Sequence, residues 1–127
     1  MQSRDVQSGR ELPEVPYFTL DMHERPDTDV VEVLLTGDLD ALTAGHLEDS
    51  LGWVVDRMPQ RHVVVDVAGL VRVESSGVDT LVRFRGRLAK DRRTLRITGA
   101  TSRVRASLRV AGLLTPADPD PPTRTVA

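Results

Sequence analysis

The chain has no cysteine among its 127 residues, and aromatic residues make up only 3% of it. The first absence excludes disulfides, thiolate catalysis and zinc sites with sulfur ligands, and it fits a reducing compartment. The second predicts a core of Val, Leu and Ala. No segment approaches the ~20 apolar residues of a membrane-spanning helix, and the charged N-terminus lacks the apolar run of a secretion signal. We therefore expect a cytoplasmic protein that has no membrane contact.

Several chemical motifs are also missing. Neither a Gly-x-x-x-x-Gly-Lys nor a Gly-x-Gly-x-x-Gly loop is present, which removes the standard phosphate-binding loops of nucleotide folds. A Gly-x-Ser-x-Gly nucleophile elbow is lacking as well. His23, His46 and His62 are far apart and do not have the spacing of metal ligands. We expect no cofactor, no metal and no catalytic role.

The length predicts one domain with one core. Residues 1–16 are polar and carry two prolines, and we interpret them as a flexible N-terminal leader. Residues 116–127 contain four prolines, which are incompatible with a helix or a central strand, and we interpret them as a disordered tail. The folded unit is expected over residues 17–115.

Hydrophobic periodicity inside this unit predicts alternating strands and helices. Runs rich in β-branched residues predict strands, and apolar residues spaced by three and four predict helices. Such an alternation implies crossover connections and a mixed sheet with helices packed against it, an α/β fold in the order β-β-α-β-α-β-α. We expect strands at 17–22, 30–36, 62–67 and 94–97, and helices at about 43–58, 75–88 and 101–111.

Charge is distributed unevenly. Residues 80–109 hold ten basic side chains and one acidic side chain, Asp91, whereas acids dominate the first 79 residues. A basic half can mark a nucleic-acid surface. Of the aromatic residues, however, only Phe84 is interleaved with these arginines, and a solvated helix surface is the more common reason for such a run. We expect no direct nucleic-acid binding.

The segment with the most chemical content is Val71–Leu81, in which a strand passes through Glu74, two serines and Gly77 into a helix. A serine at this point can cap the helix, with a contribution of about 1 kcal/mol. A phosphate placed on it would instead meet unpaired amide groups and the positive end of the helix dipole. The residues alone favour the capping role for Ser75 or Ser76.

Four further segments, taken together with this one, resemble the STAS domain family. Val71–Leu81 resembles the phosphorylation loop of that family, with its Asp-Ser-Ser-Gly motif. The other similar segments are the loop Gly37–Asp40, the central strand Val63–Val71, the late strand Thr94–Ala100 and the Gly112-Leu113 ending. The similarity extends in order over residues 18–114.

This resemblance implies an anti-sigma factor antagonist that is switched by phosphorylation. Unphosphorylated, such a protein binds an anti-sigma factor that is also a serine kinase and so frees a sigma factor; a phosphatase is a further partner. The family's phosphorylated serine falls on Ser75, with Ser76 as the alternative acceptor, and we expect a monomer or weak dimer. The family's usual Asp is Glu74 here, which moves the carboxylate outward. The implied partner-binding residues are Asp40, Thr43, Glu74, Ser75, Ser76, Gly77 and Asp79.

Two alternatives stay open. The chain can be a STAS subunit of a stress-signalling or lipid-transport assembly in which Ser75 is never modified. It can also be a magnesium-dependent receiver-like or phosphatase domain in which Asp38, Asp40, Asp66 and Asp79 gather at one sheet edge. Against the second, the only lysine, Lys90, lies in or just beyond a helix rather than after a late strand.

Overall fold

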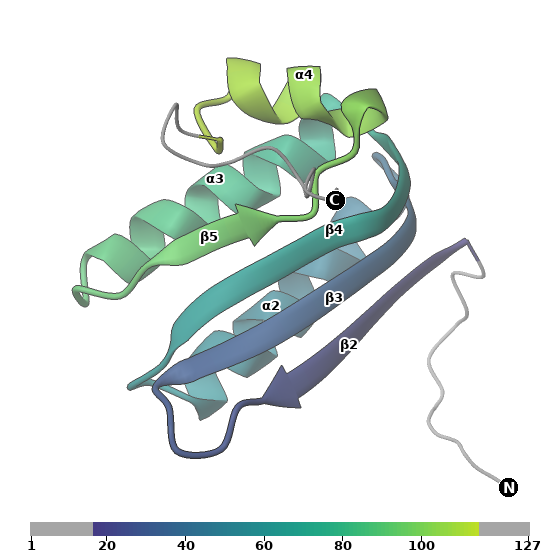
Figure 1. Ribbon diagram of the computed structural model, residues 1–127. Helices are drawn as coiled ribbons and strands as arrows, with labels where there is room; N and C mark the ends of the chain where they lie inside the picture. Colours follow the sequence, from purple (N-terminus) through teal and green to yellow (C-terminus); the bar gives the residue numbers. More distant parts are fainter. Residues whose placement is uncertain (1–16, 115–127) are drawn as a thin grey trace, which may run out of the picture.

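The computed structural model describes residues 17–114 of the chain. Within this range a sheet of four strands carries three helices, and the order β-β-α-β-α-β-α confirms the predicted α/β fold (Figure 1). The expected leader, residues 1–16, and the expected tail, residues 116–127, lie outside the described residues. The elements are β2 Phe18–Glu24, β3 Val30–Leu39, α2 Ala44–Arg57, β4 His62–Val73, α3 Ser75–Ala89, β5 Leu95–Thr98 and α4 Ser102–Val110.

The sheet has the strand order β2-β3-β4-β5, in which β2 is antiparallel to β3 and the other pairs are parallel. Parallel neighbours need crossover connections. Helices α2 and α3 supply them and cover one face of the sheet, while α4 lies across the end of the sheet (Figure 1). This topology brings the carboxyl ends of β3 and β4 to the same edge, where each strand passes into a helix.

Strand β4 is longer than the sequence pattern predicts, because it stays paired with β3 through two register shifts. At the first shift Gly69 lies opposite Thr36, and a Cβ on this glycine would be 2.6 Å from Thr36 Cγ2. Beyond the second shift Asp38 pairs with Arg72, and Leu39 pairs with Val73. Bulges of this kind interrupt the alternation of inward and outward side chains, which is why the extension is hidden in the sequence.

The core is aliphatic, as the scarcity of aromatics predicts. The largest fully buried side chains are all leucines and valines. They come from the inward positions of the central strands and from the inner faces of the helices. Examples are Val31, Val33, Leu35, Val63, Val65, Leu47, Leu51, Leu81, Leu88 and Leu108.

Part of the basic segment faces acids of a neighbouring helix. Arg83 of α3 contacts both carboxylate oxygens of Glu48 on α2, at 3.2 and 3.3 Å. One turn later Arg87 is 2.6 Å from Asp56. Exposed pairs of this kind contribute about 0–1 kcal/mol each. These two arginines therefore help to align α2 and α3. Because both are paired with acids, they do not form a free basic surface for a nucleic acid.

Arg93 is the most deeply buried cation among the described residues, with 7% of its surface exposed. Its Nη1 donates to the carbonyls of Met58 at 3.0 Å and Arg61 at 3.4 Å, which belong to the connection between α2 and β4. Its Nη2 contacts Asp91 at 3.4 Å. One guanidinium thus ties the start of β5 to the end of α2.

We predict that Arg93→Ala lowers the free energy of unfolding by about 2 kcal/mol, because it removes buried hydrogen bonds together with packing. Lys90→Ala is the control, since Lys90 is exposed at the end of α3. Urea denaturation of both variants measures the difference. Equal midpoints for the two would contradict the role assigned to Arg93.

Candidate functional site

Two connections meet at the carboxyl edge of the sheet. One is the loop that leads from β3 into α2, and the other is the junction between β4 and α3. The backbone N–H of Glu74 donates to the carbonyl of Leu39 at 2.8 Å, which joins the two connections directly. The site predicted from the sequence, around Asp40 and Ser75, is therefore brought together in space.

The loop before α2 is held by Asp40. Its Oδ1 accepts hydrogen bonds from the N–H groups of Leu42 at 3.0 Å and Thr43 at 3.1 Å. In return the Thr43 hydroxyl accepts from Asp40 N at 2.8 Å and donates to the carbonyl of Asp38 at 2.9 Å. Asp40 is 6% exposed and Thr43 is fully buried. Thr43 fixes the shape of this loop and presents no surface of its own.

Ser75 is the first residue of α3, and Glu74 occupies the N-cap position before it. No side-chain capping bond is made at this helix start, so the expected capping role of Ser75 or Ser76 is wrong. The helix begins with Glu74 in an extended conformation, and the Glu74 carbonyl accepts from Gly77 and Val78. Ser75 is exposed, and its hydroxyl has no hydrogen-bond partner within residues 17–114. Ser76 is half-buried.

Gly77 allows α3 to lie against the end of β3. A Cβ at this position would be 2.2 Å from Leu39 Cγ, a distance at which something must shift. Gly77 is therefore a packing residue beneath Ser75, and its own surface is buried. Any larger residue would push the first turn of α3 away from the β3 loop.

We predict that Gly77→Ala destabilises the protein, although alanine favours helices, because its methyl group overlaps Leu39. Gly86→Ala is the matched control on the same helix, since nothing lies within 4 Å of its added Cβ; it should raise stability by about 0.5–1 kcal/mol. Thermal unfolding of both variants tests the pair. If Gly77→Ala stabilised the chain as Gly86→Ala does, the close contact would be refuted.

A groove of about 530 Å³ opens beside Ser75, between α3 and α4. Its surface is mainly apolar, and Val110 on its α4 side is 89% exposed. Asp79 is the one charged residue among the described residues that line it. The lining residues are Ser75, Val78, Asp79, Ala106, Ser107, Val110 and Ala111.

Arg72 is a site residue that sequence analysis did not identify. Its Nη2 lies 3.3 Å from Glu74 Oε2 and 3.7 Å from Asp40 Oδ2, so one guanidinium links the two connections. The spacing of Arg72 and Glu74 could have predicted their ion pair, because residues two apart in extended backbone point to the same face. A strand was expected to lead into Glu74, but Arg72 was given no role in it.

The pKa of the Tyr17 hydroxyl shows how nearby charges act on this edge of the sheet. Partial burial, and then the carboxylates of Asp40 and Asp38, raise the pKa of its hydroxyl above the ordinary 10.0, while Arg72 acts in the opposite direction. Tyr17 is 36% exposed and lies immediately before β2. The edge of the sheet that carries Ser75 and the Asp40 loop therefore has a negative electrostatic potential, which the positive charge of Arg72 partly offsets.

We predict that absorbance at the tyrosinate wavelength titrates with a midpoint above pH 10.0, the ordinary value. Tyr17 is the chain's single tyrosine, so the signal is unambiguous. Asp38→Asn should lower the midpoint and Arg72→Gln should raise it, because they remove a negative and a positive charge respectively. A midpoint that neither substitution moves would show that these charges do not reach the ring.

The structure does not bring together the acids of the magnesium-dependent alternative. Among residues 17–114 no group of three His, Asp or Glu side chains could hold a metal ion. The Asp66 carboxylate instead accepts a hydrogen bond from Ala68 N at 2.9 Å, within β4 and away from Asp40. The magnesium-dependent alternative therefore has no site in this part of the chain.

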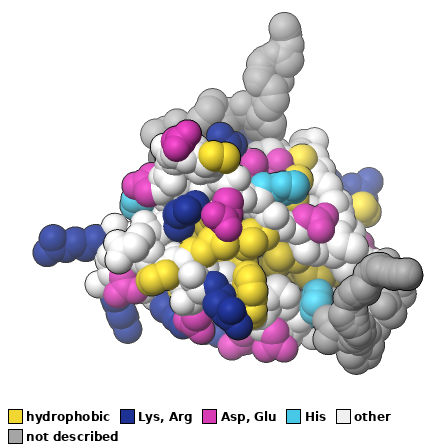
Figure 2. All heavy atoms as spheres, turned by 90° about the horizontal axis from the view of Figure 1, so that it is seen from below, with side chains coloured by type: hydrophobic (Ala, Val, Ile, Leu, Met, Phe, Trp, Pro, Cys, Tyr) yellow, Lys and Arg dark blue, Asp and Glu magenta, His cyan; other side chains and the backbone are white. Residues whose placement is uncertain are grey.

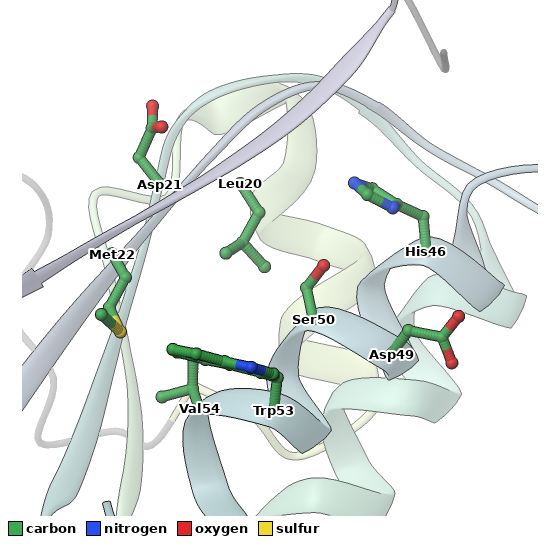
Figure 3. Close-up of a pocket in the computed structure, with 8 residues that line it drawn as sticks. All are labelled: Leu20, Asp21, Met22, His46, Asp49, Ser50, Trp53 and Val54. Carbon is green, nitrogen blue, oxygen red and sulfur yellow. The ribbon is translucent and has the colours of Figure 1, made fainter. Parts of the chain in front are cut away.

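A second groove, of about 400 Å³, lies between β2 and α2. Leu20, Met22, Ser50 and Trp53 point into it, whereas Asp49 points away (Figure 3). Seen from below, hydrophobic side chains form a central patch bordered by charged ones (Figure 2). This groove shares no lining residue with the groove beside Ser75.

The family model of the MlaB-type STAS domain matches residues 22–115. The chain belongs to the STAS domain family. No curated protein matches it, but solved STAS structures do. An anti-sigma factor antagonist from Mycobacterium paratuberculosis is 25% identical, with a TM-score of 0.65 over 76% of this chain and 79% of that one.

Other STAS structures share the fold at lower identity. The anti-sigma factor antagonist SpoIIAA, in its unphosphorylated form, is 17% identical with a TM-score of 0.64, over 75% of this chain and 82% of its own. A variant of RsbS from Moorella thermoacetica is also 17% identical, with a TM-score of 0.61 over 75% and 79%. The fold is thus shared with two structures of anti-sigma factor antagonists.

None of the helices in residues 17–114 combines the length and the apolar character required to cross a bilayer.

Proposed function

We propose that the chain is an anti-sigma factor antagonist that works by partner switching. In its unphosphorylated state it binds an anti-sigma factor that is also a serine kinase, and the sigma factor is released. Phosphorylation of Ser75 ends this binding. The observation that carries the proposal is the exposed Ser75 hydroxyl, which has no hydrogen-bond partner in the described residues and borders an apolar groove.

The chemistry at Ser75 is a phosphoryl transfer that the partner catalyses. The Ser75 oxygen forms a bond to the γ-phosphorus of ATP as the bond to the ADP leaving group breaks, and the hydroxyl proton passes to a base of the kinase. The antagonist contributes an accessible hydroxyl on a rigid helix start. It acts as a substrate and needs no catalytic group of its own.

Charge explains why the modification would release the partner. A phosphate adds about −1.5 to −2 charges and three acceptor oxygens, next to Glu74 and on the same groove as Asp79. An interface fitted to a neutral hydroxyl would have to accommodate this dianion, and none of the described residues that line the groove is basic. A loss of about 3 kcal/mol, which is typical of an unpaired charge in an interface, weakens binding about a hundredfold.

The proposed contact surface runs from Glu74 and Ser75 across the α3–α4 groove to Asp79 and Val110. Asp40 lies at its edge through its link to Arg72. Thr43 and Gly77 are buried and support this surface from below. Ser76 is half-buried, so it is the poorer acceptor of the two serines. We propose further that the protein acts in the bacterial cytoplasm, as a monomer or weak dimer.

We predict that Ser75→Ala retains the kinase-like partner in a pull-down from native cells and that Ser75→Glu loses it. Intact mass of the recovered wild type should show no phosphate on the partner-bound protein. Ser102→Glu is the matched control, because Ser102 is also an exposed first residue of a helix but lies on α4. It should bind as the wild type does.

Equal recovery of the partner by Ser75→Ala and Ser75→Glu would contradict the proposal that phosphorylation of Ser75 controls partner binding. Equal loss by Ser75→Glu and Ser102→Glu would show that added charge anywhere on this side is disruptive, which removes the special position of Ser75.

A second function has one observation in its favour. Glu74 stands where the STAS family usually has Asp, and its carboxylate is engaged by Arg72 rather than held ready beside the serine. This arrangement suits a STAS subunit of a larger assembly in which Ser75 is a contact residue and is never modified. A Ser75 that stays unphosphorylated in growing and stressed cells, together with loss of assembly in Ser75→Glu, would favour this function.

A further inference from the structure

Arg72 forms ion pairs with Glu74, the residue before Ser75, and with Asp40 of the β3–α2 loop. It is the next residue but one before Glu74, at the end of β4, and its Nη2 is shared between Glu74 and Asp40. Its side chain is 59% exposed. The guanidinium can therefore change partners without disturbing the core.

Both present contacts of Arg72 are weak. The two carboxylates use the same nitrogen, at 3.3 and 3.7 Å, whereas charge-assisted hydrogen bonds of arginine measure about 2.7–2.9 Å. Neither contact has the two parallel bonds that make arginine–carboxylate pairs strong. Ion pairs with this much solvent exposure contribute little.

Other arginines near α3 are already engaged. Arg83 and Arg87 contact acids of α2, and Arg93 is buried beneath the α2–β4 connection. Of the described residues that line the Ser75 groove or form an ion pair with Glu74, Arg72 alone is basic.

We propose that Arg72 binds the phosphoryl group of phosphorylated Ser75 and leaves Asp40 when it does so. This inference rests on the function proposed above and names the residue through which modification reaches the Asp40 loop. A phosphate offers three oxygens and up to two charges, and the planar guanidinium matches that geometry with paired donors. A single shared carboxylate contact cannot compete with it.

When Arg72 leaves Asp40, the charge of the β3–α2 loop changes as well as that at Ser75. Asp40 Oδ1 stays bound to the N–H groups of Leu42 and Thr43, so the loop keeps its shape. Asp40 Oδ2 loses the cation that now partly neutralises it. A partner that spans both connections would then meet an uncompensated carboxylate at the loop in addition to the phosphate at Ser75.

The test uses protein with phosphoserine installed at position 75 during synthesis, so that no kinase is needed. Phosphorus NMR follows the titration of the phosphate in wild type, Arg72→Gln, Arg72→Lys and the control Arg83→Gln. We expect the phosphate pKa to be lower in wild type than in Arg72→Gln by about 0.5–1 unit. Arg72→Lys should keep part of this difference, and Arg83→Gln, which removes the same net charge, should match the wild type.

Equal phosphate pKa values in wild type and Arg72→Gln would overturn the assignment, as would an equal rise in Arg83→Gln. Tyrosinate absorbance of Tyr17 reports the release of Asp40. Phosphoserine at position 75 should raise the Tyr17 midpoint more in wild type than in Arg72→Gln, because only the wild type has a guanidinium to withdraw. Equal rises would show that Arg72 stays at Asp40.

Phosphorylation of Ser75 in cells and binding of the phosphate by Arg72 are tested independently. If Ser75 carried no phosphate in native cells, the proposed switch would be wrong, but the phosphate titration of the synthetic phosphoprotein would not be affected. An unchanged titration in Arg72→Gln would remove the role of Arg72 while the pull-down with Ser75→Ala and Ser75→Glu still stood.

Discussion

The close approach of the β3 end to the first turn of α3 is the constraint on which the site depends. Leu39 accepts a hydrogen bond from Glu74 N and packs where a side chain on Gly77 would lie. This contact fixes the Asp40 loop beside Ser75, although the two are far apart in the chain. The parallel pairing of β3 and β4 makes it possible, because it carries both strands to the same edge.

The same contact concentrates negative charge around a neutral hydroxyl. Asp38 at the end of β3, Asp40 and Glu74 in the two connections and Asp79 in α3 carry this charge, and Arg72 is the cation that contacts two of them. Such a surface accommodates a serine hydroxyl, whereas its carboxylates repel a phosphate dianion unless a cation moves to the phosphate. A rigid scaffold can thus change its binding properties through one covalent group, without refolding.

The fold class, the order of the elements and the aliphatic core are predictable from the sequence, because the periodicity of the helices and of the valine-rich strands is strong. The position of Ser75 at a strand–helix junction is predictable as well. The continuity of β4 from His62 to Val73 was not predicted, because the bulges at Gly69 and beyond break the alternating pattern. Arg72 lay in an expected strand but was given no role. The capping role of Ser75 was wrong, because Glu74 takes the N-cap position one residue earlier.

The most direct measurement is the phosphate occupancy of Ser75 in two pools of the native protein, one bound to its partner and one unbound. Both pools are isolated from the same cells, and the phosphate is located by peptide fragmentation. Partner switching predicts an unmodified Ser75 in the bound pool and phosphoserine concentrated in the unbound pool. The same occupancy in both pools would contradict it.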